Sequence, residues 1–75
     1  MHTLDILLRN TAEVQSFANL VNRFPFTISL RQGRAVTDAK SILGIYSLDL
    51  TKPVTVEVYS NMAGELLEAL QKYSA

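Results

Sequence analysis

Hydrophobic residues recur at every second position in three segments of the chain, which is the period of a β-strand with one buried face. These segments are residues 4–8, 26–30 and 54–58. The last one alternates valine with threonine and glutamate, and its β-branched residues favour a strand. Gln32-Gly33 indicates a tight turn after the second segment, so residues 34–38 are predicted to return as the second arm of a hairpin. The pattern therefore predicts four strands.

Hydrophobic residues are spaced at three- and four-residue steps in three other segments, as in an amphipathic helix. The first stripe runs from Val14 to Phe24. Pro25 is expected to end this helix, because the residue before a proline is pushed out of the α region. The second segment, residues 42–47, is little more than two turns long. The third covers residues 62–73, with Ser60 or Asn61 available as its cap.

The resulting order, β-α-β-β-α-β-α, predicts a single domain over residues 1–75. Its class is α+β: a four-stranded antiparallel sheet with three helices on one face. A hairpin placed between two helical connections is also compatible with a ferredoxin-like arrangement. Its second helix is long, however, whereas the corresponding segment here is short.

The composition excludes several classes of function. The chain is 48% hydrophobic and 19% charged, which is enough to build one core. Seven basic and seven acidic residues cancel, so the chain has no net charge to attract nucleic acid or an anionic membrane. With no cysteine and one histidine, no disulfide, metal site or cofactor is expected. There is no signal-peptide layout and no apolar run long enough to span a bilayer, so we expect a cytoplasmic protein.

Residues 39–48, Ala-Lys-Ser-Ile-Leu-Gly-Ile-Tyr-Ser-Leu, resemble the regulatory-serine region of HPr. HPr is the small phosphocarrier of the bacterial sugar phosphotransferase system, and the likeness is to its Gram-positive form. The Leu-Thr-Lys-Pro-Val-Thr-Val stretch continues the resemblance without a gap, and the element order extends it to nearly the whole chain. The resemblance implies an open-faced two-layer sandwich and a phosphoprotein rather than an enzyme.

The chain departs from the family at the phosphate site. HPr proteins carry His-x-Arg-Pro at the start of the first helix, where the imidazole accepts phosphate. With Phe17 placed on the family's helix phenylalanine, Asn10 stands at the histidine. Ala12 then stands at the arginine and Glu13 at the proline. An amide cannot form a phosphoryl intermediate, so no catalytic residue is expected. Asn10 and Glu13 have instead the spacing of a capping box, and His2 is expected to be an exposed strand residue.

Ser41 corresponds to the serine that HPr kinase/phosphorylase modifies in Gram-positive members of the family. Without modification it is expected to cap the short helix by accepting a backbone N–H. Phosphorylation would add close to two negative charges at a helix N-terminus, next to Lys40. The resemblance therefore implies a regulatory phosphorylation site at Ser41.

The short helix carries more apolar side chains than one face can bury. The residues predicted to point inward are Ile42, Ile45 and either Leu48 or Leu50. The residues predicted to face solvent are Leu43, Tyr46 and Ser47. An exposed apolar patch with a polar rim is typical of a partner surface, although these side chains are equally consistent with a cover for the core. In HPr proteins the matching surface docks enzyme I, sugar permease domains and the catabolite-control repressor. The resemblance therefore implies a partner-binding role for Lys40, Leu43, Tyr46 and Ser47. Asp49 replaces the family's glycine at the helix end and leaves the partner's identity open.

These features favour a non-catalytic protein that resembles the histidine-less catabolite-repression variants of HPr. Its expected partners are HPr kinase/phosphorylase, a catabolite-control transcription regulator or an enzyme I-like component, bound through Ser41 and the surface of Leu43 and Tyr46. Two alternatives stay open. One is a functional phosphocarrier, and the other is a scaffold or inhibitor that occupies phosphotransferase components without accepting phosphate.

Overall fold

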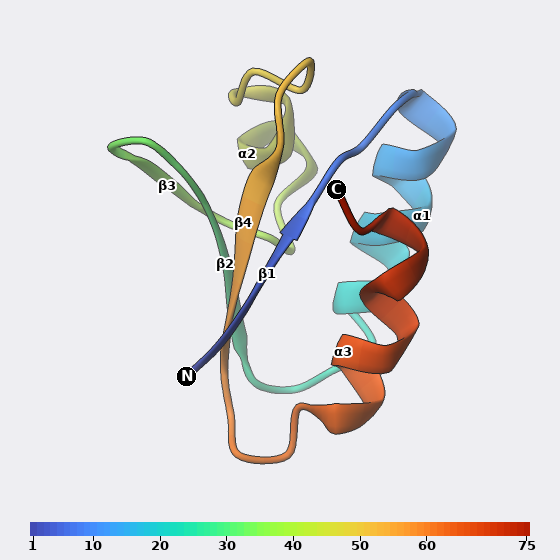
Figure 1. Cartoon of the computed structure of the whole chain (residues 1–75), viewed down its shortest axis with the longest axis vertical. Helices are drawn as coiled ribbons and strands as arrows, with labels where there is room; N and C mark the ends of the chain where they lie inside the picture. The colour runs from blue at the N-terminus through green and yellow to red at the C-terminus, as the bar shows by residue number, and fades with distance from the viewer.

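The chain folds with its elements in the predicted order (Figure 1). The computed structural model describes residues 1–75. The strands are β1 (His2–Ile6), β2 (Thr27–Gln32), β3 (Ala35–Asp38) and β4 (Val54–Tyr59). The helices are α1 (Thr11–Val21), α2 (Ile42–Tyr46) and α3 (Gly64–Ala69), and α3 continues into a 3₁₀ helix, η1 (Leu70–Tyr73). The α+β class predicted from the hydrophobic pattern is confirmed.

All strands pair antiparallel in the order β1-β4-β2-β3, so β4 is central and pairs with both β1 and β2. Leu4 of β1 and Leu30 of β2 both oppose Val56 of β4. Because side chains alternate along a strand, these residues share one face of the sheet. The helices cover that face: α1 and α3 lie side by side along it (Figure 1), and Ile45 of α2 belongs to the same hydrophobic core.

The core is a single cluster of 18 buried residues to which every helix and three of the strands contribute. Phe17 of α1 is fully buried at its centre. Its ring meets that of Tyr73 of η1 edge-on, with 6.0 Å between centroids and an angle of 83° between planes. Edge-to-face packing of this kind is favourable for aromatic pairs. This contact fixes the C-terminal helix against α1.

The opposite face of the sheet carries no helix, and its central residue is Glu57. The Glu57 side chain is nevertheless only 7% exposed, because its neighbours cover it. Arg31 Nε donates to Glu57 Oε2 at 2.9 Å, and Tyr59 Oη donates to Glu57 Oε1 at 3.2 Å. The hydrogen bond from Arg31 is the largest cause that lowers the pKa of Glu57 below its usual value.

Two of the predicted element ends are wrong. The first strand ends at Ile6 rather than at Leu8, although Leu8 is buried as expected. Helix α1 ends at Val21, well before Pro25. The Asn22 N–H still donates to the Ala18 carbonyl at 3.1 Å, but the next two N–H groups, of Arg23 and Phe24, donate to carbonyls only three residues earlier, at 3.1 and 3.2 Å. The α-helical bonding therefore gives way to tighter turns before the proline is reached.

The last helix and the hairpin turn also differ from the prediction. Helix α3 begins at Gly64, and neither Ser60 nor Asn61 caps it, since Ala63 occupies the cap position without a side-chain hydrogen bond. In the hairpin Gln32 pairs with Ala35, so the two loop residues are 33 and 34. Gly33 has a φ of 59°, and a positive φ at the first loop residue alone is the pattern of a type II′ turn.

No helix combines the length and apolar character needed to cross a lipid bilayer.

Candidate functional site

The start of α1 is closed by hydrogen bonds from its own side chains. Asn10 has extended backbone geometry, and its Oδ1 accepts the Glu13 N–H at 2.8 Å. In return Glu13 Oε1 accepts a backbone N–H at 2.8 Å, but from Arg9 and not from Asn10 as the capping-box spacing predicted. The Arg9 guanidinium lies 3.8 Å from the same carboxylate oxygen. The cap is thus confirmed, with its second hydrogen bond shifted by one residue.

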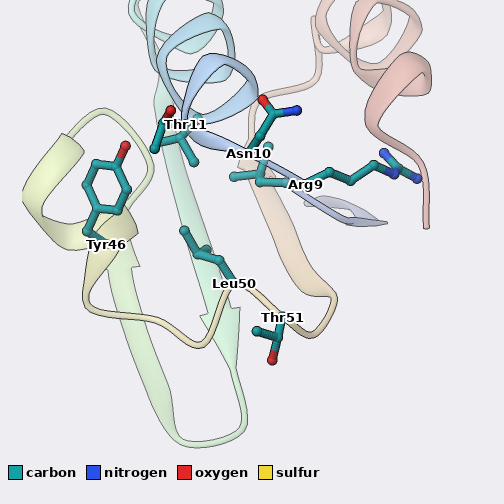
Figure 2. A pocket seen from close by; sticks show the side chains of 8 residues that line it. Arg9, Asn10, Thr11, Tyr46, Leu50 and Thr51 are labelled. Carbon is teal, nitrogen blue, oxygen red and sulfur yellow. The ribbon is translucent and has the colours of Figure 1, made fainter.

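A pocket of about 260 Å³ opens beside this cap. Its apolar lining comes from Leu8, Val14, Tyr46 and Leu50, and its polar lining from Arg9, Asn10, Thr11 and Thr51. Figure 2 shows that three segments enclose it: the start of α1, Tyr46 from α2, and the loop that follows α2. The Arg9 side chain extends away from Tyr46 and Leu50 (Figure 2), and its Nη1 donates to the Leu7 carbonyl at 3.3 Å.

The side chains that line this pocket include the hydroxyls of Thr11, Tyr46 and Thr51 but no histidine or cysteine. No group of three or more His, Cys, Asp or Glu side chains gathers anywhere in the structure. His2, the one histidine, begins β1, and the N-terminus lies at the opposite end of the molecule from the start of α1 (Figure 1). The pocket can therefore accept a side chain of a partner by shape and burial, but it has no imidazole to receive phosphate.

Ser41 occupies the cap position of α2, as predicted. Its backbone is extended, and its Oγ accepts the Gly44 N–H at 3.2 Å. Gly44 itself lies against β3, and a Cβ added there would collide with the Thr37 side chain. The helix can approach β3 this closely only because residue 44 has no side chain. Ser41 is thus held at the beginning of a helix whose position is fixed by packing.

The orientation of the α2 side chains is confirmed. Leu43 is 80% exposed and Tyr46 is 48% exposed. The inward residues are Ile45 and Leu48, which are buried, and Ile42 and Leu50, which are partly buried. Ser47 is exposed, and its hydroxyl donates to the Gly44 carbonyl at 2.6 Å, which closes the end of α2. The contact role of this surface stays a prediction.

Lys40 is less available than the sequence implied. It is half-buried, and its Nζ donates to the Phe24 carbonyl at 2.6 Å. Its backbone N–H donates to Asp38 Oδ1 at 2.9 Å, and its own carbonyl accepts from Asn22 Nδ2 at 3.2 Å. Lys40 thus joins the segment after α1 to the segment before α2. One of the three ammonium N–H donors is thus used within the protein, and the half-buried Lys40 is held in place while its remaining donors can still meet a partner.

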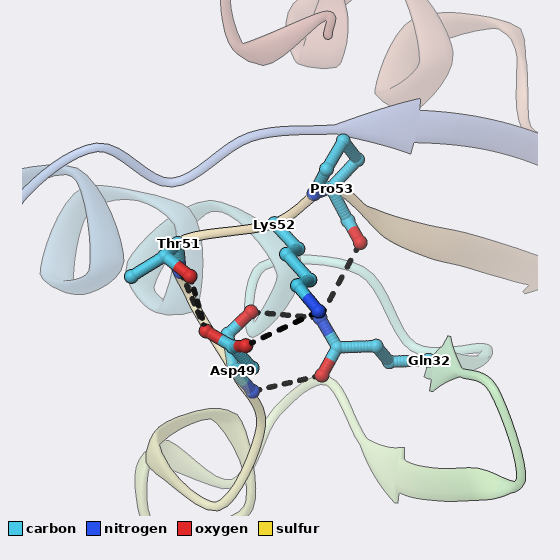
Figure 3. Close-up of polar contacts among 5 residues, drawn as sticks. All are labelled: Gln32, Asp49, Thr51, Lys52 and Pro53. Atoms are coloured by element: carbon cyan, nitrogen blue, oxygen red, sulfur yellow. Dashed lines mark hydrogen bonds and ion pairs between the residues drawn. The ribbon is translucent and has the colours of Figure 1, made fainter.

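Sequence reasoning missed the clamp that positions the loop after α2 (Figure 3). The Gln32 side chain forms two hydrogen bonds with the backbone of one residue: Oε1 accepts the Asp49 N–H at 2.8 Å, and Nε2 donates to the Asp49 carbonyl at 2.7 Å. The Gln32 side chain thus pairs with the Asp49 backbone in the way that an adjacent strand pairs with its neighbour, and it fixes the loop to β2. Leu50 and Thr51, which follow in this loop, form one wall of the pocket.

Asp49 takes part in this clamp with its carboxylate as well. Its Oδ1 accepts the Thr51 N–H at 3.1 Å and the Thr51 hydroxyl at 2.5 Å. The hydroxyl bond is the largest cause that lowers the pKa of Asp49. The Asp-x-Thr spacing is a local signal of an Asx turn that could have indicated this role. Asp49 does not adopt the left-handed conformation that favours glycine at a helix end, since Gly33 is the one residue with a positive φ.

Comparison with known structures agrees with the fold described above. Residues 10–75 match the family model described as the PTS HPr component phosphorylation site. A phosphocarrier protein HPr from Bacillus anthracis str. Ames is 30% identical, with a TM-score of 0.71 over 99% of this chain and 94% of that one. HPr-C-His from Thermoanaerobacter tengcongensis shares the fold at 23% identity, with a TM-score of 0.81 over 96% of this chain and 89% of that one. No curated protein sequence matches.

Proposed function

The chain belongs to the HPr family of the phosphotransferase system, and we propose that within this family it is a regulatory or binding member that does not relay phosphate. The family consists of phosphocarrier proteins rather than enzymes, and its members interact with phosphotransferase proteins such as enzyme I. The proposed unit is a single HPr-like domain over residues 1–75, with Asn10 at the position of the family's phosphohistidine.

The start of α1 is the observation that carries this proposal. The Asn10 carboxamide has no nitrogen basic enough to accept a phosphoryl group, and its oxygen already accepts the Glu13 N–H at 2.8 Å. The negative charge of the Glu13 carboxylate would repel a phosphate bound at this helix end. Arg9, the nearest cation in the sequence, is paired with Glu13 and bound to the Leu7 carbonyl. Each of these contacts opposes an anion at this helix end.

Regulation is proposed to act through Ser41. A phosphoryl group on its Oγ would place close to two negative charges at the first turn of α2, where backbone N–H groups tolerate them. The modified serine would stand beside Leu43 and Tyr46, whose exposed side chains supply apolar anchors for a partner. The proposed partners are HPr kinase/phosphorylase, which would modify Ser41, and a catabolite-control transcription regulator, which would bind the product.

The first test is incubation with phosphoenolpyruvate and enzyme I, followed by intact-mass measurement. The expected result is an unchanged mass. The matched control restores the family signature with Asn10→His, Ala12→Arg and Glu13→Pro, and this variant is expected to gain one acid-labile phosphate. An acid-labile phosphate on the unaltered chain would overturn the proposal and establish the alternative function, a working phosphocarrier.

The second test is incubation with HPr kinase/phosphorylase and ATP. One acid-stable phosphate is expected on the unaltered chain and on Ser47→Ala, and none on Ser41→Asn. Asparagine keeps an oxygen that can accept the Gly44 N–H, so this variant loses the phosphorylation site while it retains the helix cap. If the unaltered chain gains no phosphate while a Gram-positive HPr does, the regulatory part of the proposal is wrong.

A scaffold or inhibitor is the second candidate, and the exposure of Leu43 and Tyr46 favours it independently of Ser41. Such a protein would occupy enzyme I without accepting phosphate. It predicts that the unmodified chain slows phosphate transfer from enzyme I to a functional HPr, and that Leu43→Ser relieves this inhibition.

A further inference from the structure

A second hollow surface lies on the other side of α1, between this helix and η1. It consists of two adjoining depressions of about 520 and 330 Å³, which share Ala12, Ser16 and Lys72. The Ser16 hydroxyl and the Tyr73 hydroxyl lie 2.6 Å apart and join the two helices. We refer to this surface as the α1–η1 groove. It includes none of the α2 residues of the proposed regulatory surface.

The groove contains two cations without an acidic partner, Arg23 and Lys72. Of the five other basic residues, Arg9, Arg31 and Lys52 form ion pairs, Lys40 is bound to a carbonyl, and only Arg34, at the hairpin turn, is also without a partner. Arg23 forms no ion pair, and its guanidinium enters no hydrogen bond within the protein.

Lys72 is equally free of carboxylates. Its Nζ lies 5.3 Å from the centroid of the Tyr73 ring. Glu68 precedes it by four residues but forms no ion pair with it. Lys72 belongs to a 3₁₀ helix, whose three residues per turn move the fourth residue off the common face. The ammonium group is therefore available to an external anion.

Asn19 supplies hydrogen-bond donors between these cations. Gln15 Nε2 donates to Asn19 Oδ1 at 3.2 Å, so the Asn19 oxygen is used and its amide N–H groups remain free. The one carboxylate along the groove is that of Glu13, which lines the smaller depression and is bound to Arg9. The larger depression therefore offers positive charge and hydrogen-bond donors without a competing carboxylate.

We propose that the α1–η1 groove binds a short acidic segment of a protein partner. Its carboxylates pair with Arg23 and Lys72 and accept hydrogen bonds from the Asn19 amide. From Glu13 to Arg23 the groove follows ten residues of chain, or about 15 Å at the rise of a helix. An extended segment of about four or five residues covers that length. The repulsion by Glu13 directs the acidic end of the segment toward Arg23.

The test is a titration of the ¹⁵N-labelled protein with acetyl-pentaglutamate amide at low ionic strength, followed by amide chemical shifts. The largest shifts are expected at Asn19, Leu20, Arg23 and Lys72. Arg23→Gln and Lys72→Gln are each expected to weaken binding by about two- to fivefold, the range typical of exposed ion pairs. Added salt is expected to weaken it further. The matched control is Arg34→Gln, which removes the same charge at the hairpin turn and is expected to bind as the unaltered chain does.

Three outcomes overturn the proposal: shifts that concentrate on α2, an equal loss of binding in Arg34→Gln, or no shift at all. A hexathymidylate titration tests nucleic acid as the other class of polyanion. If that oligonucleotide saturates the same residues at a lower concentration than the peptide, the groove is not an acidic-peptide site. Because neither probe involves phosphorylation, these results are independent of the tests on Asn10 and Ser41.

Discussion

The packing of Gly44 against Thr37 makes a sharp prediction about the regulatory helix. A methyl group at residue 44 would overlap the Thr37 hydroxyl and would lie only 3.3 Å from the Thr37 Cβ. Overpacking of this kind costs about 1–3 kcal/mol. Replacing glycine by alanine inside a helix returns about 1 kcal/mol through helix propensity. Gly44→Ala is therefore expected to destabilise the protein by up to about 2 kcal/mol, or to leave it near neutral if α2 relaxes.

The effect of Gly44→Ala on stability is expected to disappear or reverse when the Thr37 side chain is shortened. In a Thr37→Ala background the hydroxyl is absent, and Gly44→Ala is expected to be neutral or to stabilise by up to about 1 kcal/mol. Thr37→Val is the matched control, because it removes the hydroxyl chemistry but retains a branched side chain of similar size. In that background Gly44→Ala is expected to destabilise as it does in the unaltered chain.

Urea unfolding at 25 °C measures all six proteins of these cycles. The expected coupling between residues 37 and 44 is about 1–3 kcal/mol, well above the error of about 0.5 kcal/mol for independent sites. A coupling below that error would show that α2 does not contact β3 as closely as the structure indicates. The same result would also mean that close packing against Thr37 does not explain why residue 44 is a glycine.

Three further predictions concern caps and charges. Ser41→Ala is expected to lower the free energy of unfolding by about 1 kcal/mol while Ser41→Asn leaves it nearly unchanged, and urea unfolding distinguishes them. Because Arg31 lowers the pKa of Glu57, the folded state binds a proton less readily than the unfolded chain, whose glutamate titrates near 4.5. Stability should thus be fully present above that pH and fall as the pH drops below it; a loss in Glu57→Gln as steep as in the unaltered chain would contradict this. Gln32→Ala should release the loop after α2, with faster hydrogen exchange at the Asp49 amide and a loss of about 1 kcal/mol; unchanged exchange there would exclude the clamp.

The clearest functional prediction, the absence of phosphate relay, depends on local features that the sequence contains. Asn10 and Glu13 are three residues apart, and so are Ser41 and Gly44. Both pairs form the caps that their spacing predicts. The outward direction of Leu43 and Tyr46 also follows from the helical period alone. Hydrophobic alternation was enough to predict three of the strands, since period 2 assigns each side chain to a face, and the Gly33 turn predicted the fourth. The order of the strands in the sheet had no such signal.

Tertiary structure decided the features that join distant segments. Lys40 meets the Phe24 carbonyl, which lies 16 residues earlier, and Gln32 clamps Asp49, which lies 17 residues later. Neither side chain carries a local signal of its partner, because each bond exists only after the sheet and helices have packed. The α1–η1 groove arises in the same way, from two helices separated by most of the chain. Periodicity determines which side of an element is buried, but only packing determines which polar groups meet and which charges are left without a partner.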